Sequence, residues 1–245
     1  MVNYPYIDVE PLFTEMVREY PMGCVLTDII PHPDFSNADF IFHHEKVVAE
    51  FKRIEIDNVT SLNNQAKMNA VVDKFYNEGK IKTKNINEEN WPRLPKELTE
   101  SIYEITTQSV EGQIKKANQQ IKDTKIKLRL NTYKGVLIIV NDGVESYPPA
   151  AFHYAIFRLL RRKFSGITFF IYFTANVVAK HGDFLHPMNY WIGQDMEKDG
   201  KMDAALSTSL HKAWAGLLAR KCGLESATFE LTDMEAYWKA RNVPK

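Results

Sequence analysis

Two apolar runs in the second half of the chain limit most strongly what it can fold into. GVLIIVNDG occupies 135–143 and ITFFIYFTA occupies 167–175. Neither run alternates between apolar and polar residues, as a strand with one face in water would. The segment between them, at 150–164, has the apolar spacing of a helix. Two fully apolar strands joined by a helix predict a parallel pair buried on both faces, and hence an α/β fold.

The rest of the chain adds helices and strands around this unit. Apolar spacing predicts helices at 9–20, 95–124 and 204–222, and β-like runs predict strands at 24–30, 38–43 and 46–54. With strands and helices interleaved in this way, we expect a central mixed β-sheet flanked by helices. We expect a single domain over 1–245, with its core at about 7–175.

Two regions fall outside that core pattern. A polar stretch at about 57–94 interrupts the strands and contains one helical segment, 62–77, which Gly79 closes. We interpret it as a helical insertion after the third strand. Residues 176–202 have the composition of loops or short strands and precede the last helix. They predict a C-terminal α+β extension over about 176–245.

The charges cancel overall but are unevenly distributed. Lysine plus arginine equals aspartate plus glutamate at 31 each, whereas residues 1–60 hold eleven acids and four bases. The segment 113–134 has the opposite sign, with seven bases facing only Asp123. An acidic region that can hold cations, beside a basic segment, suits a protein that handles phosphates. The alternative is that both are ordinary solvated faces.

Cysteine usage and the absence of long apolar runs bear on location. Cys24 and Cys222 are the only cysteines, too few for a disulfide framework or a thiolate zinc site. The first residues lack the pattern of a signal peptide, and no apolar run approaches the ~20 residues that cross a bilayer. We therefore expect a cytoplasmic protein without membrane association.

The stretch NADFIFHHEKVVAEFKRIE, 37–55, reads as a hairpin whose register can be deduced. With His44 and Glu45 as a two-residue turn, Phe40 faces Ala49 and Phe42 faces Val47, which gives one apolar face. The same register sets Asp39 opposite Glu50 on the other face, with Lys52 two residues further along that face. A slip by one residue would bury the charges and expose the phenylalanines.

Two carboxylates in that arrangement have a specific chemical use. Cross-strand neighbours have Cβ atoms about 5 Å apart, so Asp39 and Glu50 could share one divalent cation. Carboxylate oxygens suit Mg²⁺ or Mn²⁺, and two protein ligands leave positions open for water and a phosphate oxygen. Lys52 would stabilise developing charge or help to activate the attacking water. Together these residues predict phosphodiester hydrolysis; the alternative is a surface hairpin with ordinary charges.

Asp39 and EFK, Glu50 to Lys52, resemble the motif of the PD-(D/E)xK, or restriction-endonuclease-like, nuclease superfamily. The resemblance implies a Mg²⁺-dependent nuclease, with DNA as substrate in preference to RNA, and a restriction-endonuclease-like core. The sequence departs from the motif because the literal Pro-Asp is Pro33 and Asp34, which leaves Asp34 as an alternative to Asp39. The (D/E)xK pattern also begins at Glu78, Asp123 and Asp199.

The resemblance also implies further site residues. A glutamate from the first helix often joins the metal site, and Glu10 is our choice over Glu15 and Glu19. Polar residues of the second helix often contact substrate, and here they would be Gln113, Lys116 and Gln120, at i, i+3 and i+7. A solvated helix face is the alternative explanation for all of them.

Other patterns carry less chemistry. No Walker loop, Gly-x-Ser-x-Gly elbow or Gly-x-Gly-x-x-Gly turn occurs, and HGDFLH at 181–186 is a weak metal pattern. The second functional hypothesis is a catalytically inactive module of the same fold that binds other molecules, for example in a defence or toxin-related complex. A homodimer or a protein partner is compatible with either hypothesis.

Overall fold

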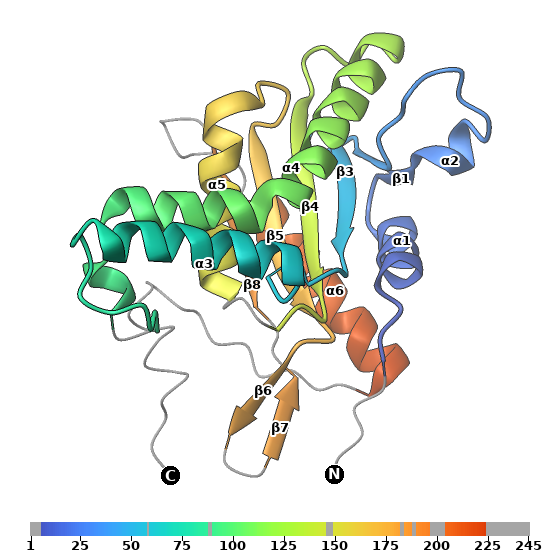
Figure 1. Ribbon diagram of the computed structural model, residues 1–245. Helices are drawn as coiled ribbons and strands as arrows, with labels where there is room; N and C mark the ends of the chain where they lie inside the picture. The colour runs from blue at the N-terminus through green and yellow to red at the C-terminus, as the bar shows by residue number, and fades with distance from the viewer. Residues whose placement is uncertain are drawn as a thin grey trace.

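The computed structural model describes residues 6–57, 59–87, 90–145, 149–181, 184–187, 190–196 and 204–223. A six-stranded sheet with the order β1-β2-β3-β4-β5-β8 forms its centre (Figure 1). The strands are β1 (Gly23–Val25), β2 (Phe40–Phe42), β3 (Val47–Ile54), β4 (Lys134–Asp142), β5 (Phe169–Ala175) and β8 (Trp191–Asp195). Strands β3, β4 and β5 run parallel and the other pairs are antiparallel. The predicted α/β class, mixed sheet and parallel β4–β5 pair are confirmed.

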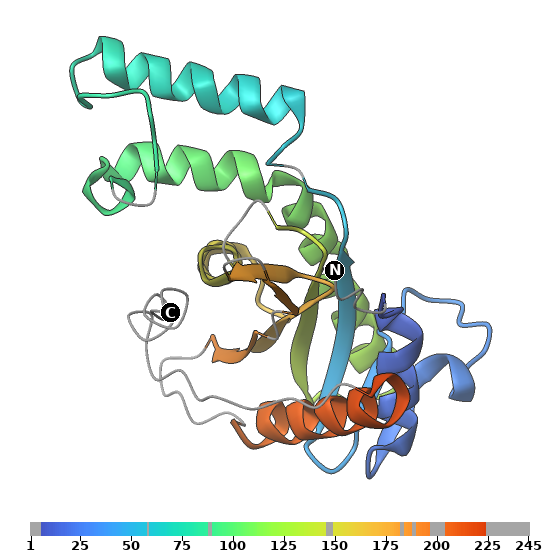
Figure 2. The same cartoon turned by 90° about the horizontal axis from the view of Figure 1, so that it is seen from below.

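Helices cover both faces of this sheet (Figure 2). Helices α1 (Val9–Glu19) and α6 (Ala204–Cys222) pack on one face, and α5 (Pro149–Lys163) and the C-terminal half of α4 (Lys96–Lys127) pack on the other. On the first face Phe13 is fully buried, with its ring centroid 5.7 Å from that of Trp214. Strands β4 and β5 lie between the layers and are buried almost throughout, which explains their unbroken apolar sequences.

Strand β3 divides its side chains between the two layers. Val47, Ala49 and Phe51 belong to the core under α1 and α6, whereas Val48 and Ile54 belong to the core under α4 and α5. Glu50 and Lys52 have the parity of Val48 and Ile54, so they face α4. We deduced the hairpin register from the alternation of apolar and charged side chains. The same alternation directs successive side chains of β3 toward opposite layers of helices.

The predicted insertion forms a helical arm beside the sheet. Helix α3 (Leu62–Asn77) begins at Ser61, whose Oγ accepts a hydrogen bond of 3.3 Å from the Asn64 amide. It runs along the N-terminal half of α4, away from the sheet (Figure 2). The arm, completed by the 3₁₀ turn η1 (Trp91–Arg93), has its own apolar cluster. The buried residues of that cluster are Val72, Phe75, Ile81, Leu98 and Ile102.

The strand predicted at 24–30 is wrong beyond Val25. Strand β1 ends there and the short helix α2 (Leu26–Ile29) follows. Strand β2, which pairs with β1, is only three residues long, so the residues after Val25 have no strand residues opposite them in β2. The Ile30 amide instead donates to the Leu26 carbonyl at 2.8 Å, and Asp28 forms an ion pair of 2.7 Å with Arg18.

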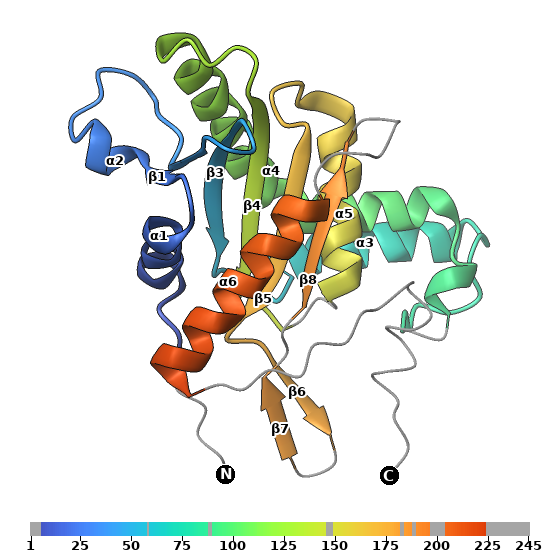
Figure 3. The ribbon, with the colours of Figure 1, turned by 180° about the vertical axis from the view of Figure 1, so that it is seen from behind.

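The chain beyond Ala175 contributes to the same sheet and core. Strands β6 (Val178–His181) and β7 (Phe184–Pro187) form a separate hairpin, and β8 then pairs antiparallel with β5. Trp214 of α6 lies in the core under β3, β4 and β5. Figure 3 shows α6 crossing this face of the sheet. The predicted helix at 204–222 is confirmed, and the remainder of the extension, 224–245, lies outside the described residues.

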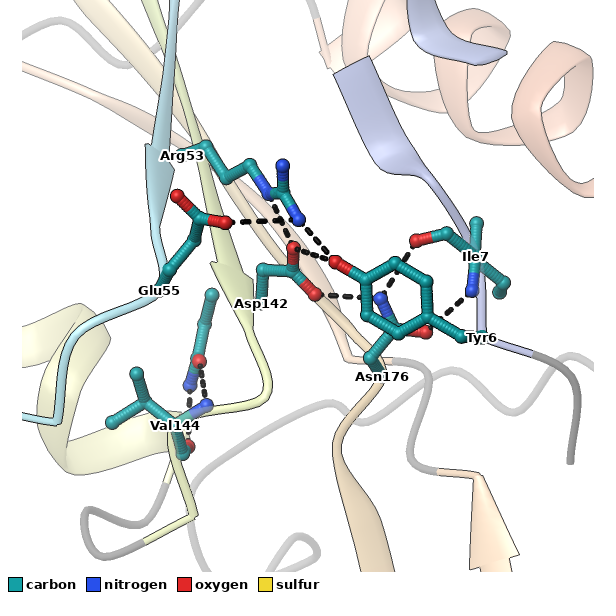
Figure 4. Close-up of polar contacts among 8 residues, drawn as sticks. Tyr6, Ile7, Arg53, Glu55, Asp142, Val144 and Asn176 are labelled. Carbon is teal, nitrogen blue, oxygen red and sulfur yellow. Dashed lines mark hydrogen bonds and ion pairs between the residues drawn. The ribbon is translucent and has the colours of Figure 1, made fainter. Parts of the chain in front are cut away.

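A cluster of hydrogen-bonded polar residues joins the first described residues of the chain to the carboxyl ends of the parallel strands (Figure 4). Asp142, with a side chain only 2% exposed, accepts a hydrogen bond from Arg53 and another, of 2.6 Å, from the Asn176 amide. Asn176 also pairs with both backbone groups of Ile7, each at 2.8 Å. Arg53 in turn contacts the Tyr6 hydroxyl. We call Tyr6, Ile7, Arg53, Asp142 and Asn176 the strand-end clasp.

None of the helices in the described ranges combines the length and the apolar character needed to cross a bilayer.

Candidate functional site

The hairpin has the register deduced from the sequence. Phe40 pairs with Ala49 and Phe42 with Val47, and Lys46 takes a positive φ of 54° in the turn. Continued by one residue, this register sets Asp39 opposite Glu50. The Asp39 Oδ2 atom accepts a hydrogen bond of 2.8 Å from the Phe51 backbone amide. The Asp39 carboxylate is therefore fixed against the strand that carries Glu50.

Glu50 and Lys52 complete a compact cluster on this face. The Glu50 side chain is 1% exposed, and its Oε1 atom accepts a hydrogen bond from Lys52 Nζ. Its Oε2 atom is buried and accepts no hydrogen bond from the described residues. The Lys52 side chain remains 17% exposed. The structure thus brings together Asp39, Glu50 and Lys52, with one carboxylate oxygen unsatisfied and one cation at the edge of solvent.

Burial changes the protonation of both acids. The pKa of Glu50 is raised to about 8, chiefly because burial penalises its charge and also because Asp39 lies close, while Lys52 opposes the rise. Burial also raises the pKa of Asp39, against the opposing effects of the Phe51 amide and Lys52. With a pKa of about 8, Glu50 holds a proton at neutral pH. Acids that interact in this way titrate as a pair, because each carboxyl affects the pKa of the other.

Helix α4 positions this cluster through two polar side chains. Gln120 accepts a hydrogen bond of 3.2 Å from Lys52 Nζ at Oε1 and donates one of 2.8 Å from Nε2 to the Asn37 carbonyl. One turn later, the Thr124 hydroxyl accepts a bond of 2.7 Å from the Ala38 amide. Both residues that precede Asp39 are therefore tied to α4, and Lys52 is tied to the same helix.

The three residues proposed to contact substrate have different positions. Gln120 contacts Lys52 directly, as described above. Lys116 is exposed on α4, and its charge lowers the pKa of Asp39 in opposition to burial. Gln113 is half-buried, and no hydrogen bond joins it to the described residues of the cluster. Thr124, which we did not select from the sequence, lies one turn after Gln120 on the same side of α4, and that spacing is the signal for it.

Glu10 remains apart from the acid pair. It is exposed in the first turn of α1, which covers the opposite face of the sheet from Glu50. Glu15 and Glu19 form ion pairs of 2.7 and 2.5 Å with Lys221 and Arg220 of α6. Within the described ranges, no three His, Cys, Asp or Glu side chains gather in a way that could hold a metal. Asp39 and Glu50 therefore form a group of two acids, and Glu10 does not join them.

The other candidate positions differ from Glu50 in their surroundings. Asp34 is exposed in the loop before the hairpin. Glu78 forms an ion pair of 2.8 Å with Lys80 at the end of α3, and Asp123 accepts a hydrogen bond of 2.8 Å from Gln119. Asp183 and Asp199 lie outside the described residues, as do the side chains of His181 and His186. Of the (D/E)xK matches that the structure describes, that at Glu50 is the one joined to a second acid.

No protein-family model, curated protein or solved structure matches this chain. The chemistry of the site is therefore inferred from its own residues.

Proposed function

We propose that the protein is a Mg²⁺- or Mn²⁺-dependent nuclease that hydrolyses phosphodiester bonds, with DNA as its substrate. The observation that carries this proposal is the pair formed by the half-buried Asp39 and the buried Glu50, on the same face of the hairpin as Lys52. Two hard oxygen donors beside an ammonium group match the needs of a phosphate and its metal ion. A structural role alone would not require a buried glutamate to face a second acid, because burial and the neighbouring carboxylate both penalise its ionised form.

The donors present fit a divalent cation. The Oε2 atom of Glu50 is buried without a hydrogen-bond donor, and Glu50 carries a proton at neutral pH. A cation held by Asp39 and Glu50 would take the place of that proton and satisfy the free oxygen. When bound, a divalent ion supplies charge stabilisation to the phosphate and lowers the pKa of a bound water.

The chain's own residues then orient and assist the reaction. Gln120 holds Lys52 Nζ beside Glu50, and the Phe51 amide holds Asp39. Lys52 would place positive charge next to a phosphate oxygen, where negative charge grows as water attacks phosphorus. The bond from phosphorus to the leaving sugar oxygen would break in the same event, the proton lost by the attacking water would pass to solvent, and the leaving oxygen would take a proton from Lys52 or solvent.

A second candidate is a catalytically inactive module of the same design. The observation that favours it is the contact between Lys52 Nζ and Glu50 Oε1, which satisfies one oxygen of Glu50 without a metal. In addition, the described residues provide two acids here and no third. In this case the cluster would hold the hairpin against α4, and the protein would act by binding a partner.

The decisive test is incubation of the full chain with Mg²⁺ or Mn²⁺ and labelled single-stranded, duplex and branched DNA, together with RNA. Glu50→Gln retains the shape of the protonated acid, so we expect it to fold and to lose cleavage by a factor of about 100 or more. Glu78→Gln is the matched control, since it alters a (D/E)xK motif on the exposed arm. Equal cleavage by wild type and Glu50→Gln would exclude the proposed site, and cleavage of RNA alone would reassign the substrate.

A further inference from the structure

A row of exposed cations leads away from the acid pair. It consists of Lys116 and Lys127 on α4, Arg129 and Lys134 in and after the turn that follows, and Lys46 in the hairpin turn. We call these five residues the basic ridge. Lys116 and Lys127 belong to the C-terminal half of α4, and Lys46 and Lys134 stand at the starts of β3 and β4. Figures 1 and 3 show the C-terminal end of α4 at the end of the sheet where β3 and β4 begin.

Among the described residues, no carboxylate forms an ion pair with the basic ridge. The ion pairs among the described residues use other bases, such as Arg18 with Asp28 and Arg220 with Glu19. No ridge residue takes part in an ion pair with another described residue. Asp123, the one acid in 113–134, accepts a hydrogen bond from Gln119. Within the described part of the chain the charge of the ridge is therefore uncompensated, in contrast to a solvated face with interspersed acids.

The ridge is continuous with the candidate site. Lys116 lies one turn before Gln120 on α4, and Gln120 contacts Lys52. Lys127 Nζ lies 6.0 Å from the centre of the Phe35 ring in the loop before Asp39. At the far end, the Lys134 amide donates a bond of 2.8 Å to the Lys46 carbonyl. At 1.5 Å of rise per residue, Lys116 and Lys127 are about 16 Å apart along the helix.

We propose that the basic ridge binds the sugar–phosphate backbone of a nucleic-acid strand that extends from the acid pair past the end of α4. A length of about 16 Å spans roughly five nucleotides at the axial rise of B-form DNA. The substrate is thus a polymer with several phosphates beyond the reacting bond, and mononucleotides lack the contacts needed. This inference deepens the proposed function and rests on it for the position of the reacting bond.

An anionic membrane surface is the competing partner, and the surroundings of the ridge disfavour it. A membrane-bound helix presents an apolar face to the lipid. Here the apolar face of α4, with Ile114, Ala117 and Ile121, is fully buried against the sheet. Ile126 is the one large hydrophobic side chain exposed in this half of α4 among the described residues. Backbone phosphates require only the cations.

The test measures binding without chemistry. Fluorescence anisotropy in EDTA would compare labelled DNA of roughly 30 nucleotides, single-stranded and duplex, with a labelled trinucleotide. Lys127→Glu combined with Arg129→Glu reverses two ridge charges. Lys67→Glu combined with Lys74→Glu is the matched control, because both lysines are exposed on α3. We expect the ridge variant to bind the long DNA at least tenfold more weakly, with the slope of log K against log salt reduced by roughly 2, and the control to match wild type.

Three results would overturn the inference. They are equal loss of affinity in both double variants, equal affinity of wild type for trinucleotide and long DNA, and ridge-dependent binding to phosphatidylglycerol vesicles without binding to DNA. Because the assay contains no divalent metal, it is independent of cleavage. Ridge-dependent DNA binding combined with absent cleavage would therefore remove the nuclease proposal and leave the binding surface.

Discussion

Lys52 Nζ lies 3.2 Å from the Oε1 atom of Gln120, so a helix side chain holds the one ammonium group of the acid cluster in place. The other end of the same amide holds the Asn37 carbonyl at 2.8 Å, two residues before Asp39. Gln120 therefore connects β3 and the segment that leads into β2 to α4. A change at this residue should affect the geometry of the reaction as well as the packing of the hairpin.

We predict that Gln120→Ala lowers kcat for nucleic-acid cleavage by about tenfold, because Lys52 loses the group that orients it, with a smaller effect on KM. The free energy of unfolding should fall by about 1 kcal/mol, since the Asn37 carbonyl loses its donor. Steady-state cleavage and urea unfolding would measure the two effects. Gln119→Ala, which removes only the neighbouring bond to Asp123, should leave kcat unchanged. A kcat for Gln120→Ala equal to that of Gln119→Ala would contradict the positioning role.

The raised pKa of Glu50 predicts a pH dependence of stability. The pKa of this carboxyl is 4.5 in its reference state and about 8 in the folded protein, so the folded state binds the proton more tightly. Its contribution to stability is complete below about pH 4.5 and is lost as the pH rises through 8, by an amount on the order of a few kcal/mol. Glu50→Gln cannot lose a proton and should lack this decline.

The measurement is urea unfolding of wild type and Glu50→Gln, without divalent metal, from pH 5 to 8.5. As the pH increases, the unfolding free energy of wild type should fall relative to that of Glu50→Gln. Glu78→Gln, at an exposed acid, serves as the control and should track wild type. A wild type to Glu50→Gln difference that is constant across this range would show that Glu50 is ionised in the folded protein throughout.

The strand-end clasp predicts a large effect from a residue far from the acid cluster. Asp142→Ala leaves Arg53 without its buried partner and removes an acceptor from Asn176, so it should destabilise the protein by about 3 kcal/mol. Asp28→Ala, which breaks the exposed ion pair with Arg18, is the matched comparison and should have a much smaller effect. Chemical unfolding would compare them, and equal destabilisation would show that the clasp contributes no more than a surface pair.

The hairpin and the central strands were predictable because their side-chain patterns follow directly from burial. Phe40, Phe42 and Phe51 must share one face, and that requirement places Asp39 opposite Glu50. The apolar runs that became β4 and β5 likewise had no stable position other than between two layers. In these cases the residues themselves determine the structure.

Other features depend on what lies nearby in space. CVLTDII has the composition of a strand throughout, but strand β2 is too short to pair with its second half, which becomes α2. The contacts of Gln120 with Lys52 and Asn37 depend on the packing of α4 against the hairpin, whereas its selection as a substrate contact stays a prediction. Glu10 is separated from the acid pair because α1 covers the opposite face of the sheet. The spacing of residues along the chain does not show which face a helix covers.

The most direct test of the site is calorimetric titration of the metal-free protein with Mn²⁺ at pH 7. The predicted result is one bound ion per chain, with proton release from Glu50 that appears as a dependence of the binding heat on the ionisation enthalpy of the buffer. Asp39→Asn should abolish this binding, while Asp28→Asn, at an exposed acid of α2, should preserve it. Binding of Mn²⁺ that survives Asp39→Asn, or no binding by the wild type, would contradict the assignment of Asp39 and Glu50 as a divalent-cation site.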